Sequence, residues 1–65
     1  MYALMYRTSI GNNIMMKETY RTLADAESGV LDSFPWVRED GMQRGNDSST
    51  FNLSDGSSII IFREL

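Results

Sequence analysis

The chain has 65 residues, with nine acidic and six basic side chains, a net charge of −3, and neither histidine nor cysteine. A chain this short buries only about 60% of its unfolded surface, so we expect one small α+β domain over residues 1–65. The missing residue types exclude a histidine base, a thiolate nucleophile and a cysteine or histidine zinc site. Because such a chain lacks these supports, self-association as a homodimer through a sheet face or edge is one expected source of stability.

The six basic residues are spread along the chain without a run. Nucleic-acid affinity comes largely from clustered Lys and Arg that neutralise phosphates, so direct binding to nucleic acid is not expected, nor is any cofactor. No stretch approaches the roughly eighteen apolar residues that a membrane span needs, and the first ten residues lack a basic leading segment. We therefore expect a cytoplasmic protein without a membrane anchor, whose partner is another protein.

An alternation of aromatic and aliphatic residues opens the chain. Tyr2, Leu4 and Tyr6 are separated by single residues, which predicts a strand over about residues 2–9. Glycine and asparagine at positions 11–13 tolerate the backbone of a tight reversal, so residues 14–20 are expected to form the second arm of a hairpin. The side chains of this arm suit a helix equally well, and the sequence leaves both alternatives open.

Thr22 begins the clearest element of the sequence. Asp25 follows three residues later, which resembles a capping box. The apolar residues then recur at spacings of three and four, which predicts an amphipathic helix of about three turns on one side of a sheet; they are Leu23, Ala26, Val30 and Phe34. Pro35 ends the helix at or before Phe34, and Gly29 weakens its middle by about 1 kcal/mol relative to alanine. The opposite face carries Asp25, Ser28 and Asp32.

The second half of the chain contains two hairpin signals, Asp40-Gly41 and Asp55-Gly56. An extended segment is expected to start at residues 36–37, and residues 41–50 form either a loop or a weak strand. Residues 59–62 are apolar on both faces, as in the middle strand of a sheet. The predicted fold is a mainly antiparallel sheet of three to five strands in the order ββαββ(β), with one amphipathic helix packed on one face and something else covering the other.

Trp36 is the most informative single residue. Its ring either caps the core beneath Phe34 or is partly exposed as a binding anchor among charged neighbours. Met15 and Met16 point to opposite faces if their segment is a strand, so one sulfur lies away from the helix and is a candidate for a dimer or partner contact. The candidate partner-binding residues are Trp36, Arg38, Glu39, Asp40, Arg44, Asp25, Asp32 and Met16.

Three classes of function fit these residues. The first is a small non-enzymatic protein-binding module, a stoichiometric inhibitor or adaptor that occupies a surface of a larger complex. The second is a nucleic-acid-linked regulator of toxin–antitoxin type, and the third an accessory enzyme subunit or ligand carrier. The first is favoured, because the chain lacks catalytic groups, a basic patch and a pocket-sized core.

In size and composition the chain is similar to inhibitors that phages and other mobile elements direct against host defence systems, anti-CRISPR proteins among them. The resemblance covers no specific residues. It implies an acidic inhibitor that blocks a basic nucleic-acid channel on its target by charge complementarity.

Overall fold

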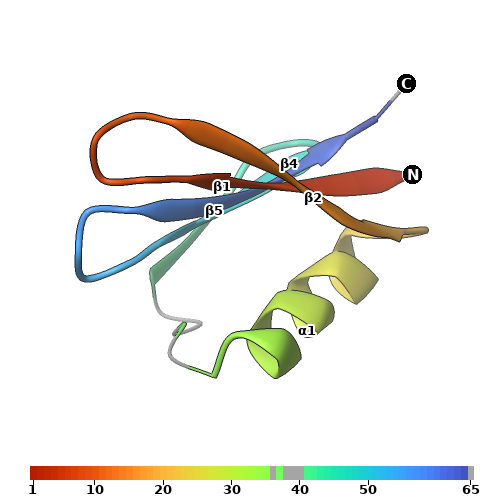
Figure 1. Cartoon of the computed structure of the whole chain (residues 1–65). Coiled ribbons are helices and arrows are strands. Elements are labelled where there is room, and N and C mark those ends of the chain that lie inside the picture. The colour runs from red at the N-terminus through yellow and green to blue at the C-terminus, as the bar shows by residue number, and fades with distance from the viewer. Residues whose placement is uncertain (36, 38–40, 65) are drawn as a thin grey trace.

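The computed structural model describes residues 1–35, 37 and 41–64. All strand pairs of its five-stranded sheet are antiparallel, in the order β2-β1-β5-β4-β3. One helix lies across one face of the sheet (Figure 1). This confirms the expected α+β fold and its ββαβββ order. In chain order the elements are β1 (Tyr2–Arg7), β2 (Asn13–Tyr20), α1 (Leu23–Ser33), β3 (Met42–Arg44), β4 (Ser48–Asn52) and β5 (Ser58–Arg63).

The first two strands form the expected hairpin, and residues 14–20 are strand rather than helix. β1 ends at Arg7, two residues earlier than predicted, because the turn already begins at Thr8. The Thr8 amide donates to the carbonyl of Asn12 at 2.8 Å, and the Gly11 amide donates to the carbonyl of Thr8 at 3.0 Å. The pairing between β1 and β2 shifts register between Ala3 and Met5, so β2 carries a bulge opposite the first half of β1.

The helix begins and ends as the sequence predicts. The Thr22 hydroxyl accepts a hydrogen bond from the Asp25 amide at 3.0 Å, which caps the first turn. At the other end, the Phe34 amide donates to the carbonyl of Val30 at 2.9 Å. The side chains of the predicted outer face, Asp25, Ser28 and Asp32, are all exposed.

The region after the helix differs from the prediction in two respects. Val37 is buried but lies outside any strand, and its amide donates to the carbonyl of Phe34 at 2.9 Å, so Val37 does not start an extended segment. The hairpin of this region turns at residues 45–47 instead of at Gly41, because β3 pairs with β4, the strand that follows it. Trp36 and Asp40 lie outside the described residues.

The last hairpin matches the prediction. Gly56 has φ +89°, the backbone conformation that the Asp55-Gly56 turn requires of a glycine. The carboxylate of Asp55 accepts hydrogen bonds from the amide and the hydroxyl of Ser57, and this fixes the turn. β5 then enters the middle of the sheet between β1 and β4, as the apolar run at residues 59–62 predicts.

The core lies between α1 and the sheet. Ala26 and Val30 of the helix are completely buried and pack on aliphatic and aromatic side chains from three neighbouring strands. The buried sheet residues of this cluster are Leu4, Phe51, Ile59 and Ile61. Every second residue of the central strands therefore points toward the helix.

Gly29 lets the helix approach β2. A Cβ atom at this position would overlap the hydroxyl and ring of Tyr20, which lies at the end of β2. The glycine that weakens the helix by its own propensity thus provides space for an aromatic contact between α1 and β2.

Replacing Gly29 with alanine is expected to destabilise the protein by up to about 2 kcal/mol. The overlap with Tyr20 costs about 1–3 kcal/mol, which equals or exceeds the gain of about 1 kcal/mol in helix propensity. Urea unfolding measures the difference, and Ser28→Ala, at the exposed neighbouring position, is the matched control. A Gly29→Ala variant more stable than the wild type would contradict this packing.

Candidate protein-binding face

The two faces of the sheet have different surroundings. Leu4 and Ile61, which face each other across β1 and β5, belong to the core under α1. Because side chains alternate along a strand, their neighbours Ala3, Met5 and Ile60 point to the opposite side. We call this side the open face, because the helix of the described chain covers only the other one (Figure 1).

A row of residues crosses the middle of the open face through all five strands. Each residue is the direct partner of the next in the strand pairing. Three consecutive members are large and apolar, and the two toward β3 are polar. From β2 to β3 the row is Met15, Met5, Ile60, Thr50 and Gln43.

Two further rows flank the middle row. On one side Thr19, Ala3, Phe62 and Ser48 pair across β2, β1, β5 and β4. The row on the other side is polar, and its side chains bond to each other: Arg7 donates to Asn13 at 3.0 Å and Ser58 donates to Asn52 at 3.2 Å. The apolar residues of the open face therefore form one patch over β2, β1 and β5. Polar residues border it toward β3 and along the Arg7 row, much as a polar rim borders the apolar core of a protein interface.

The most exposed large apolar side chains of the described residues are in the β1–β2 region. Among the described residues, the large apolar side chains with the greatest exposure all lie in the first fifteen positions. Ile10, at the tip of the hairpin, is 83% exposed, and Met15 in the middle row is 55% exposed. The other two are Met1 and Ile14.

On the covered side, Glu27 connects the helix to the sheet. Its carboxylate is buried and accepts two hydrogen bonds from the guanidinium of Arg44, at 2.8 and 3.1 Å. The hydroxyl of Ser49 donates a third at 2.6 Å. The bonds from Arg44 hold the pKa of Glu27 below its usual value, although burial acts in the opposite direction.

Sequence reasoning missed this contact. It made Arg44 a candidate partner-binding residue and did not connect it with Glu27. The available signal was spacing: Glu27 lies four residues from both Leu23 and Leu31, so it shares the flank of the apolar stripe. Its partner could not be found in the same way, because Arg44 reaches it only through the packing of β3 beside β4.

The predicted partner-binding residues do not gather in one place. Asp25 and Asp32 are exposed on the outer face of α1, whereas Arg44 binds Glu27 on the covered side of the sheet. Met16 is half-buried and packs against the core. Of the two neighbours Met15 and Met16, Met15 is the one on the open face. The remaining candidates, Trp36, Arg38, Glu39 and Asp40, lie outside the described residues.

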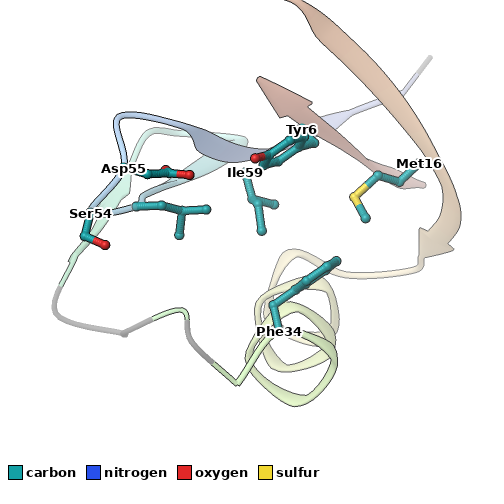
Figure 2. Close-up of a pocket in the computed structure, with 7 residues that line it drawn as sticks. Tyr6, Met16, Phe34, Ser54, Asp55 and Ile59 are labelled. Atoms are coloured by element: carbon teal, nitrogen blue, oxygen red, sulfur yellow. The ribbon is translucent and has the colours of Figure 1, made fainter. Parts of the chain in front are cut away.

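A pocket of about 350 Å³ lies beside the C-terminal end of α1 (Figure 2). Phe34 of the helix end and Met16 of β2 lie on two sides of it, and Asp55 lies at the β4–β5 turn. The hydrogen bonds from Ser57 lower the pKa of Asp55, so this carboxylate is ionised at neutral pH and already engaged in fixing its turn. The other lining residues are Tyr6, Leu53, Ser54 and Ile59.

Neither a metal cluster nor a membrane-spanning helix is found within residues 1–35, 37 and 41–64. No three acidic side chains of these segments come together as potential metal ligands. Their helix is too short and too polar to cross a membrane.

The Glu27 contact predicts a pH dependence of stability. The folded pKa of Glu27 lies below its ordinary value of 4.5, so its contribution is complete above pH 4.5 and is lost as the pH falls through the folded value. Glu27→Gln should cost about 1–3 kcal/mol at pH 7 and progressively less below pH 4.5. Urea unfolding at pH 7 and at pH 3 measures this cost, with the exposed Asp32→Asn as control. An equal cost at pH 7 and pH 3 would contradict it.

Comparison with known proteins adds no assignment to this geometry. No protein family, no curated protein and no solved structure matches the chain. The proposed function therefore rests on the chain's own residues. They form an apolar patch on one face of the sheet with polar residues beside it, and the helix is fixed to the other face.

Proposed function

We propose that this chain is a non-enzymatic protein-binding module that acts as a stoichiometric inhibitor or adaptor by occupying a surface of a larger complex. The observation that carries the proposal is the open face. Met5, Met15 and Ile60 form an apolar patch with Ala3 and Phe62 of the next row, and polar residues border this patch toward β3 and along the Arg7 row. Such a patch excludes water from the core of a protein contact while its polar rim stays solvated.

The chemistry of the middle row fits a contact surface. Burying a Met or Ile side chain that was previously in water contributes about 1.5–3 kcal/mol. Two of the three apolar members are methionines, whose flexible, polarisable side chains adapt to an irregular partner surface. The sheet holds their backbone in place, so the ordering cost on binding is limited to the side chains.

The outer face of α1 offers a second surface with a different role. Asp25 and Asp32 are seven residues apart, and both are exposed on the side of the helix away from the sheet. Two turns of helix separate them by about 10 Å. Exposed carboxylates so placed attract a basic surface and accelerate its approach more than they strengthen the final contact.

A capture experiment tests the proposed function. Tagged protein is expressed in the cells that encode it, and co-purifying proteins are quantified by mass spectrometry for the wild type, Met15→Lys and Ser28→Lys. We expect Met15→Lys to reduce the captured partner at least tenfold, because it places a charge in the apolar row. Ser28→Lys adds the same charge on the helix and should retain the partner.

Circular dichroism confirms that each variant is folded before capture is compared. Equal capture by both lysine variants would contradict a role for the open face. Stoichiometric co-purification that persists through gel filtration is also required, because an inhibitor or adaptor of this kind remains bound to its target.

A further inference from the structure

We infer that a second copy of this chain covers the open face, forming a homodimer in which two sheets pack face to face and both helices lie outside. The inference rests on the proposed function, because the second copy occupies in the free protein the surface that the target occupies in the complex. The distribution of charge and the area of the face support a second copy at this position. The outer strands of the sheet are poorly suited to pairing, which favours the face over an edge as the contact.

Among the described residues, the three rows of the open face contain no acidic side chain. The described acidic residues lie in α1, in turns, in the bulge of β2 and at the end of β5; they are Glu18, Asp25, Glu27, Asp32, Asp47, Asp55 and Glu64. The three rows carry a single charge, that of Arg7, whose side chain bonds to Asn13. In a chain of net charge −3, this is the surface on which two copies meet with the least like-charge repulsion.

The area of the face is sufficient for a weak specific dimer. With strands about 4.8 Å apart and a rise of about 3.3 Å per residue, five strands of about six residues cover about 24 Å by 20 Å. Two copies then bury roughly 1,000 Å², which is the lower limit for a specific interface. Sheets that pack face to face in this way lie about 10 Å apart, and the side chains of the two inner faces interdigitate in one layer.

The other route to self-association is pairing along an outer strand, and β2 is poorly suited to it. Its central residues Lys17 and Glu18 are charged and exposed, and the register shift between Ala3 and Met5 places a bulge at the same point. Charged side chains and bulges are features that prevent edge strands from pairing. β3, at the other edge, has only three residues. The open face is therefore the better site for a second copy.

Sedimentation velocity of the purified chain from about 1 μM to 500 μM tests the inference. We expect a monomer–dimer equilibrium in the micromolar range for the wild type. Met15→Lys and Ile60→Lys should each weaken the dimer at least tenfold, because each places a charge in the apolar layer. Ser28→Lys, with the same charge on the outer helix face, should leave the equilibrium unchanged.

The variants differ in how far they disturb the fold, so one of them remains informative if the other unfolds. Met15 is 55% exposed on an outer strand, and its replacement is expected to leave the circular dichroism spectrum unchanged. Ile60 lies on the central strand and is more buried. Folded Met15→Lys protein that dimerises as tightly as the wild type would overturn the inference.

The outcomes separate this inference from the proposed function. A wild type that stays monomeric up to 500 μM, while Met15→Lys still loses a captured partner, overturns the homodimer and leaves the binding module intact. A dimer that resists both lysine variants but is lost on Lys17→Pro places the contact at the β2 edge and also overturns the inference. A dimer lost only in the open-face variants supports it.

Discussion

A single helix can cover only one face of the sheet, and the rest of this structure depends on that constraint. α1 has eleven residues, so it is about 16 Å long and lies across one side of five strands. The core forms on that side, around Val30 and Phe51. The same strands carry apolar side chains on the other side, where Ile60 and Phe62 alternate with the buried Ile59 and Ile61. Within residues 1–35, 37 and 41–64 no second helix lies on that side, which leaves the open face without a second layer.

The position of the helix is set by two contacts at its sides. Glu27 binds Arg44 and Ser49 of neighbouring strands, which fixes the helix against the β3–β4 half of the sheet. On the other flank, Gly29 leaves space for the ring of Tyr20 at the end of β2. The buried carboxylate is stabilised because all its hydrogen bonds come from one cation and one hydroxyl in suitable geometry. Together, this polar contact and this steric contact orient α1, whose apolar stripe alone would allow it to slide along the sheet.

The open face and the helix outer face divide the chemistry of the surface between them. The former is apolar and free of acidic residues, whereas the latter carries Asp25 and Asp32. A homodimer through the open face would therefore display two acidic helices on opposite sides, each accessible to a basic partner. In this arrangement the apolar contact supplies the stability of the dimer, and the exposed carboxylates act on encounter with the target.

The sequence by itself determined the first strand, the helix and the last hairpin, because their signals are local. The helix from Leu23 follows from the spacing of its apolar residues and the cap at Thr22, and the last hairpin follows from Asp55-Gly56. Residues 14–20 were ambiguous because their side chains suit either state, and only pairing with β1 makes them a strand. The short strand β3 exists for the same reason, since Met42–Arg44 pairs with β4.

Only the tertiary structure shows which residues form the candidate site. The sequence predicted that one of two adjacent methionines faces away from the helix, but not that it is Met15, because the phase of β2 is fixed by its register with β1. Nor could it align Met15, Met5 and Ile60, which come from three strands separated in the chain. Sequence patterns report what is near along the backbone, whereas a row across a sheet depends on hydrogen-bonded register between distant segments.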